Sequence, residues 1–323
     1  MTLQALVRFV GGVVAAVLVA RLLISAAVAA SLHAMHSHRI FDVRRFSNDA
    51  VANFRLVGTF LNSRAKTGRH PIVVFAGSSV TFGHLWHERV TFAGLFADRH
   101  AAATVLNASI IAADVSAMND WIVCAARRNH LAMDVVVIEL PVVNSLSYLV
   151  NLRHVGVEPA ALSSCDGGTD LGYFGVAATT VRGAGWARFL WNRSHSSTTE
   201  RQISIGPVPK GYFASAADFA AVKPAFAKQV TTTLSNAQSV ASAVYAFPSP
   251  VFVGGLVEIG EDADAVREQL RAALEACRSV TGVQCIDPSP LYTERSYYDN
   301  FTHLSVAGHR AMANLLETRM SRH

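Results

Sequence analysis

Short, apolar runs alternate with helix-forming segments along most of this chain. The first run, Pro71–Ala76, ends at Gly77, and such a run is typical of a strand buried on both faces of a parallel sheet. Similar runs recur at Ala103–Ala108, Asp134–Leu140, Val244–Val253 and Gly282–Ile286. The segments between them space their apolar residues as helices do, at Leu85–His100, Val115–Asn129, Phe219–Ser242 and Asp262–Ser279. Strands that alternate with helices predict an α/β domain.

The alternation predicts a three-layer α/β/α, doubly wound (flavodoxin-like) parallel sheet over residues 71–323. In such sheets, sites form at the carboxyl ends of the strands. The alternation breaks from about residue 151 to 213, where Gly, Ser, Thr and aromatic residues predominate. We expect an inserted irregular segment there. Its Trp186 and Trp191 either pack the insertion onto the core or form an aromatic surface suited to sugars.

The first 38 residues differ in kind from the rest, because Arg21 is the only charged side chain between Phe9 and Met35. A bilayer core requires about 20 apolar residues, so residues 1–38 are predicted to be a transmembrane anchor. Residues 39–70 then form a membrane-proximal helix and linker. A cleaved signal peptide is the alternative, since Ala27-Val28-Ala29 has the small-x-small form of a cleavage site. Arg8 flanks one end of the apolar stretch, and Arg39, Arg44 and Arg45 flank the other. Taken literally, the positive-inside rule therefore argues against an exported domain.

The formal net charge of +5 is spread along the chain, and no basic run interleaves with aromatic residues. This pattern disfavours nucleic-acid binding. The four cysteines, Cys124, Cys165, Cys277 and Cys285, include no C-x-x-C pair, which disfavours a structural zinc site. Cys277 and Cys285 are predicted to lie on a helix and on the strand that follows it. They form either a disulfide in an oxidising compartment or two buried thiols.

The first strand leads into Gly77-Ser78-Ser79-Val80-Thr81-Phe82-Gly83, a turn that opens a helix. A serine at this position is a candidate nucleophile, because backbone N–H groups at a helix N-terminus can stabilise an oxyanion. We assign that role to Ser79. Ser78, His84 and Asn300 are candidate pocket residues, and a plain helix cap is the alternative role for either serine.

A second polar cluster lies near the other end of the chain, where Asp299, Asn300 and His303 precede a final helix. A carboxylate next to an imidazole can orient the ring and stabilise its protonated form. His303 is therefore the candidate general base. His309, in the final helix, is expected to face outward and to play no part.

These two segments resemble the blocks that define the SGNH (GDSL-like) hydrolase superfamily. Gly77 to Gly83 resemble the first block, with Ser79 at the nucleophile position, and His303-Leu304 resemble the last, which precedes the C-terminal helix. The resemblance covers about residues 70 to 320 apart from the insertion. It implies an oxyanion hole built from the N–H groups of Ser79 and Ser109 and from Asn144.

Three positions depart from the family pattern. The family's aspartate stands three residues before the histidine, where this chain has Asn300, while Asp299 stands four before. Either residue can orient His303, and we expect Asp299 to do so. The second block has Ser109 in place of a glycine. The third has Asn144 without its neighbouring Gly and Asp, so a loop cap is the alternative role for Asn144.

The resemblance implies a serine esterase or O-acyltransferase without metal or cofactor, acting on acylated glycans of the cell envelope. Membrane-anchored relatives of this type work outside the inner membrane, in the periplasm, beside membrane-bound O-acyltransferases. The same departures also fit a non-catalytic, membrane-tethered subunit of a polysaccharide modification or export complex. A short distance between the Ser79 hydroxyl and a ring nitrogen of His303 would favour the enzyme.

Overall fold

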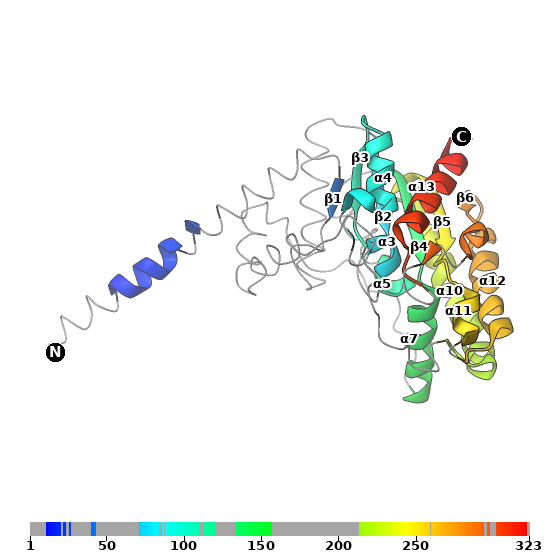
Figure 1. The fold of residues 1–323 in the computed structure, drawn as a ribbon. Helices are drawn as coiled ribbons and strands as arrows, with labels where there is room; N and C mark the ends of the chain where they lie inside the picture. Colours follow the sequence, from blue (N-terminus) through cyan, green and yellow to red (C-terminus); the bar gives the residue numbers. More distant parts are fainter. Residues whose placement is uncertain are drawn as a thin grey trace.

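The structure, a computed structural model, describes the chain in parts. These are residues 11–20, 22–23, 26, 40–42, 71–83, 86, 88–109, 113–119, 133–156, 213–258, 260–293, 296–297 and 302–321. Figure 1 shows the described helices and strands in the colours of the sequence.

The described strands form a parallel sheet in the order β1-β3-β2-β4-β5-β6. The strands are β1 (Ile40–Asp42), β2 (Ile72–Ala76), β3 (Thr104–Asn107), β4 (Met133–Leu140), β5 (Ala241–Pro248) and β6 (Val283–Cys285). Without β1, the order is 2-1-3-4-5, as in flavodoxin-like sheets. The chain therefore reverses its direction across the sheet between β2 and β4, where such folds place their sites.

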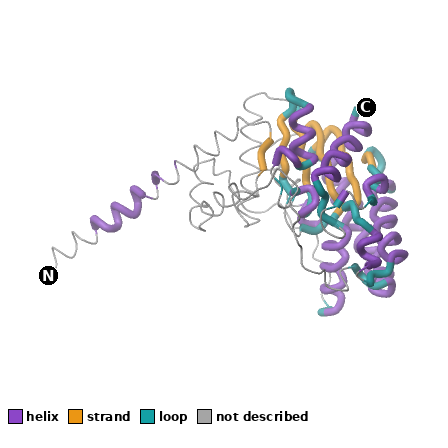
Figure 2. The backbone as a smooth tube through the Cα atoms, viewed as in Figure 1, coloured by secondary structure: helices purple, strands orange, loops and turns teal. Residues whose placement is uncertain are grey.

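Helices cover both faces of the sheet (Figure 2). The helices are α3 (Ser79–Phe82), α4 (Phe92–Arg99), α5 (Val115–Asn119), α7 (Val142–His154), α10 (Ala216–Gln238), α11 (Val253–Glu258), α12 (Ala263–Arg278) and α13 (Val306–Met320), with the 3₁₀ turns η2 (Glu88–Val90) and η4 (Ser289–Leu291). On one face α10 packs against α5, α7 and α12, and on the other α13 packs against α4. The predicted parallel α/β fold is confirmed.

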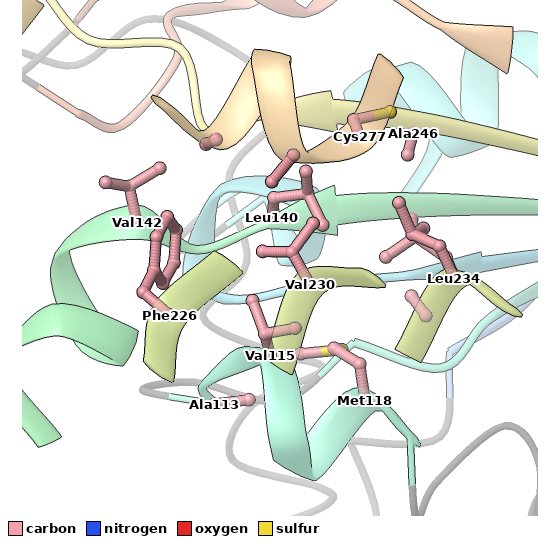
Figure 3. Close-up of a cluster of buried hydrophobic side chains, with 14 of the residues drawn as sticks. Ala113, Val115, Met118, Leu140, Val142, Phe226, Val230, Leu234, Ala246 and Cys277 are labelled. Atoms are coloured by element: carbon pink, nitrogen blue, oxygen red, sulfur yellow. The ribbon is translucent and has the colours of Figure 1, made fainter. Parts of the chain in front are cut away.

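Alternate residues of the strands feed two hydrophobic cores. On the α10 face, Phe226 and Val230 are fully buried against the strand residue Leu140 (Figure 3). On the opposite face, the ring of Phe75 in β2 makes edge contacts with the rings of Phe92 and Phe96 from α4. Because the strands are buried on both sides, they read as continuous apolar runs in the sequence.

Several element boundaries differ from those predicted. The strand expected at Val244–Val253 is β5, which ends at Pro248 and is followed by α11. The helix α7 was not predicted, since its first residues, Val142 and Val143, extend the apolar run of the preceding strand. β1 lies in the stretch expected to be a linker, yet it pairs with β3 at the edge of the sheet. The sheet thus includes residues before 71.

A disulfide joins Cys277 in α12 to Cys285 in β6, with their Cα atoms 6.0 Å apart. Of the two states left open by the sequence, the structure therefore has the bridged one. Cys124, Cys165 and residues 157–212 of the insertion lie outside the described residues.

Within the parts of the chain that are described, no helix combines the length and apolarity that a membrane span requires. Residues 11–20 are helical. Most of the other residues of the predicted anchor, including Arg21, lie outside the described residues, and the anchor stays a prediction.

Candidate functional site

The turn after β2 presents Ser79 at the start of the short helix α3. Ser78 is the N-cap of this helix, and Gly83 ends it with a left-handed φ of 70°. Gly77 is needed for a steric reason, because a Cβ atom there would lie 2.5 Å from Oε2 of Glu139. Ser79 lies after the carboxyl end of β2 and keeps partial exposure to solvent.

His303 reaches Ser79 from the other end of the domain. Its Nε2 atom lies 3.0 Å from Oγ of Ser79, although 224 positions separate the two residues in the sequence. This distance lies within the range expected of a general base and the hydroxyl that it deprotonates. The structure thus brings together the two residues on which the sequence analysis depends.

Trp86 connects the segment of His303 to the nucleophile turn. The indole Nε1–H of the buried Trp86 donates a hydrogen bond of 2.9 Å to the carbonyl oxygen of Leu304. Leu304 also forms an antiparallel bridge with Tyr297, and Ser305 caps α13 through Gly308 N–H. These contacts fix the backbone directly after His303. The sequence analysis did not single out Trp86, since no motif marks a tryptophan that donates to a distant carbonyl.

A buried carboxylate, Glu139, lies beneath the nucleophile turn. Its side chain at the end of β4 is fully buried and accepts hydrogen bonds from Ser78 N–H (2.9 Å), Ser78 Oγ (2.5 Å), Thr81 N–H (3.0 Å), Thr81 Oγ1 (2.6 Å) and Ser249 Oγ (2.6 Å). The sequence analysis gave Glu139 no role. A glutamate within an otherwise apolar strand was the available signal, because a buried acid requires several partners.

Some backbone N–H groups of the nucleophile turn have hydrogen-bond partners among the described residues, and one does not. The N–H groups of Ser78 and Thr81 bind Glu139, and that of Val80 points to Ser78 Oγ at 3.5 Å. Within the described part of the chain, Ser79 N–H has no hydrogen-bond acceptor. The predicted oxyanion donor is therefore available in this turn.

The other two predicted oxyanion donors have partners inside the protein. Ser109 N–H donates to Oδ1 of Asn107 at 3.2 Å, whereas the buried Ser109 Oγ has no hydrogen-bond partner among the described residues. Nδ2 of Asn144, in the first turn of α7, donates to the carbonyl of Ala113 at 3.0 Å. Both assignments stay predictions.

Of the remaining predicted site residues, the structure describes Ser78. The side chain of Ser78 is buried and donates to Glu139, so it supports the turn from below instead of lining a pocket. Asp299, Asn300 and His84 lie outside the described residues. The choice between Asp299 and Asn300 as the partner of His303 therefore stays open.

The expectation that His309 faces outward is wrong. His309 is 1% exposed, and its Nδ1 atom accepts a hydrogen bond of 3.3 Å from Phe92 N–H. Its ring lies 5.6 Å from the ring of Phe92, between centroids. Burial, with a smaller contribution from the nearby His303, lowers the pKa of His309 from 6.5 to about 3. His309 is therefore neutral and holds the start of α13 against α4.

Among the described residues, no group of three or more His, Cys, Asp or Glu side chains could hold a metal ion. The pairing of Ser79 with His303 is suited to chemistry that the side chains perform themselves, in which a hydroxyl attacks an electrophile while an imidazole accepts its proton.

Fold and site together define a parallel α/β protein with a serine–histidine pair where the chain reverses direction across the sheet. No family model matches the sequence, and no curated protein matches it. Among solved structures, the chain is similar to LAE5, an α/β hydrolase enzyme from the metagenome of Lake Arreo, Spain. The identity is 11% over 78% of this chain and 95% of that one, with a TM-score of 0.42.

Two acetylxylan esterases are similar to the same degree. For Axe2 from Geobacillus stearothermophilus, the identity is 12% over 78% of this chain and 94% of that one, with a TM-score of 0.43. For AlAXEase, the identity is 13% over 76% of this chain and 98% of that one, with a TM-score of 0.41. At these identities the likeness concerns the fold alone.

Proposed function

We propose that this chain is a serine-dependent carbohydrate O-acyltransferase or O-acetylesterase that acts on envelope or exopolysaccharide esters through an acyl-serine. The observation that carries the proposal is the 3.0 Å distance between Ser79 Oγ and His303 Nε2. The glycan ester as substrate rests on the resemblance of the two motif segments to SGNH hydrolases.

In the proposed mechanism, His303 accepts the proton of Ser79 Oγ while this oxygen attacks the ester carbonyl. The tetrahedral oxyanion is stabilised by Ser79 N–H, and by Ser109 and Asn144 if their present partners are released. Its collapse breaks the ester bond, and the leaving alcohol takes the proton from His303. Water or a sugar hydroxyl, deprotonated by His303, then attacks the acyl-serine. The bond to Ser79 Oγ breaks and this oxygen takes the proton back from His303, which completes an esterase or a transferase cycle respectively.

We further propose that residues 1–38 anchor the domain in the inner membrane with its site on the periplasmic side, beside a membrane-bound O-acyltransferase or another integral partner. The Cys277–Cys285 disulfide supports an oxidising compartment, since disulfides are rare in reducing cytosol. Treatment of intact cells with a membrane-impermeant thiol reagent, after reduction, would label the half-buried Cys285 only if the domain lies outside the inner membrane, whereas Cys277 is fully buried.

A second candidate function is a non-catalytic subunit of a polysaccharide modification or export complex. It is favoured by the internal hydrogen bonds of Ser109 N–H and Asn144 Nδ2, because an oxyanion hole requires donors that are free to bind the substrate oxygen.

The mass of the intact protein after exposure to an activated acetyl ester separates these functions. The wild-type domain is expected to gain one acetyl group, which disappears in Ser79→Ala. Loss of the adduct in water defines an esterase, and faster loss with added glycan defines a transferase. A folded wild-type protein that gains no acetyl group, alone or with its membrane fraction, would favour the non-catalytic subunit.

A further inference from the structure

Glu139 occupies an unusual place for a charged side chain. It is fully buried near the end of β4, next to β2, the strand that leads to Ser79, and the neighbouring residues Ile138 and Ala76 pair across the two strands. Removing a carboxylate from water is strongly unfavourable unless hydrogen bonds replace the lost water. Because burial of Glu139 disfavours folding unless its carboxylate is hydrogen-bonded, the groups that it binds indicate its role.

Four of its five donors belong to the nucleophile turn. Ser78 and Thr81 each donate a backbone N–H and a hydroxyl, and these two residues flank Ser79 and Val80. The fifth donor, Ser249 Oγ, follows β5 and ties the carboxylate to the next strand of the sheet. Backbone N–H groups can only donate, so Oε2 of Glu139 must act as their acceptor.

This arrangement controls both functional atoms of Ser79. The carboxylate holds the residues before and after Ser79 and thereby fixes the backbone from which Oγ points to His303. It also occupies the N–H groups of Ser78 and Thr81, while Ser79 N–H has no acceptor within the described chain. The carboxylate therefore occupies two N–H groups of the turn and leaves that of Ser79 unoccupied among the described residues.

We propose that Glu139 is a positioning residue, whose buried carboxylate holds the Ser79 turn in the shape that aligns Oγ with His303 and leaves Ser79 N–H free. The effect on rate rests on the proposed function. The effect on the Ser79–His303 hydrogen bond does not, and it is measured separately.

Three substitutions test the contacts of Glu139. Glu139→Leu removes all five acceptor contacts and should lower kcat for acetyl-ester turnover about 100-fold, since small misplacements of reacting groups cost about this much. Glu139→Gln keeps a carbonyl oxygen for the two N–H groups but removes the charge, and should lower kcat about 10-fold. Thr81→Val removes one hydroxyl and leaves Glu139 in place, with an expected loss of about 5-fold. KM should change little in each.

Asp134→Asn is the matched control. Asp134 lies at the opposite end of β4 and also accepts a hydrogen bond from a backbone N–H of β2, that of Ile72 at 2.7 Å. Its substitution removes a charge from the same pair of strands away from the turn. It should leave kcat, KM and the His303 signal unchanged.

A readout independent of activity is the ¹⁵N chemical shift of His303 Nε2 in protein labelled at histidine, assigned by its disappearance in His303→Gln. Glu139→Gln and Thr81→Val should change this shift as the Ser79–His303 hydrogen bond weakens. Circular dichroism and melting temperature identify any variant that has not folded, and the two milder variants decide the matter if Glu139→Leu unfolds.

The outcomes are distinct. Wild-type kcat and His303 shift in folded Glu139→Gln and Thr81→Val would overturn the positioning role and leave the proposed function intact. A wild-type protein without acylation would overturn the proposed function. In that case, a His303 shift that moves in both Glu139→Gln and Thr81→Val, and stays fixed in Asp134→Asn, would still support Glu139 as the residue that shapes the turn.

Discussion

The nucleophile and the base of the proposed site are held by different kinds of contact. Around Ser79, donors from both sides of the turn meet at one buried carboxylate, Glu139, within the sheet. Around His303, the backbone is held by the Trp86 indole at Leu304 and by the capped start of α13. Replacing Glu139 therefore removes several hydrogen bonds of the Ser79 turn at once. Near His303, by contrast, one substitution removes one hydrogen bond. Substitutions on the base side test this difference, and their expected effects on acylation rate decrease in the order given below.

The largest effect is expected from His303→Gln. The substitution removes the proposed general base and should lower the rate of Ser79 acylation by on the order of 10⁴-fold, the upper end of what a positioned acid–base residue contributes. His154→Gln, which replaces an exposed histidine at the end of α7, is the control and should react at the wild-type rate. Acylation is followed by the mass of the intact protein. A His303→Gln protein that reacts as fast as wild type would exclude His303 as the base.

A smaller effect is expected from Trp86→Phe, which removes the hydrogen bond to the Leu304 carbonyl and keeps an aromatic ring. The free energy of unfolding should fall by about 1 kcal/mol. The acylation rate should fall about 10-fold, because His303 loses part of its support. Urea unfolding and stopped-flow acylation measure the two effects. If Trp86→Phe lowered the acylation rate as much as Glu139→Leu, the support of His303 and that of Ser79 would be equally sensitive to a single substitution. The proposed difference between the two sides of the site would then be wrong.

His309 should affect stability more than rate, in a manner that depends on pH. The lowered pKa of His309, about 3 as a result of burial and of His303, means that the unfolded chain binds more protons than the folded one between about pH 3 and 6.5. The contribution of His309 to the free energy of unfolding should thus be complete above pH 6.5. As the pH is lowered below 6.5, the free energy of unfolding should fall by up to about 1.4 kcal/mol per pH unit.

The variant His309→Asn keeps an acceptor near Phe92 N–H and removes the titrating group. Urea unfolding at pH 7, 6 and 5 should therefore show a smaller decrease in the variant than in the wild type. Equal decreases would mean that His309 is already protonated in the folded protein, contrary to its buried position.

The smallest effect on rate is expected from the double variant Cys277→Ala/Cys285→Ala. Loop-closure entropy for cysteines eight positions apart predicts a loss of about 2–3 kcal/mol in stability. Acylation should remain within about 2-fold of wild type, because neither cysteine contacts Ser79 or His303. Thermal unfolding with and without reductant provides the measurement. A large loss of rate at a temperature where the variant is folded would show that β6 influences the site.

Much of the fold could be predicted because strands that are buried on both faces are apolar at every position, and such runs stand out in the sequence. The predicted strand Pro71–Ala76 corresponds to β2 to within one residue. α7 was missed for the same physical reason, since its β-branched start, Val142 and Val143, continues an apolar strand. β1, with three residues, is too short to give a pattern of its own.

The site could be predicted where a motif is local and not where it depends on contacts between distant residues. Ser79 and His303 were proposed from short segments, and the structure places them in hydrogen-bond distance. The partners of Glu139 come from two other parts of the chain, the turn of Ser78 and Thr81 and the residue after β5, Ser249, which no spacing reveals. His309 was assigned to the wrong side of α13, although Val306, Met312 and Leu316 place it on the buried stripe of that helix.

The long separation of Ser79 and His303 has a consequence for the biogenesis of the protein. As the chain is made from its N-terminus, the nucleophile turn can dock on β4 and β5 while the segment of His303 has yet to emerge. Any chemistry that needs both residues then begins only after β6 has joined the sheet and α13 has packed against α4. A nascent or truncated chain would carry a shaped but unreactive serine, so that reactivity reports completion of the fold.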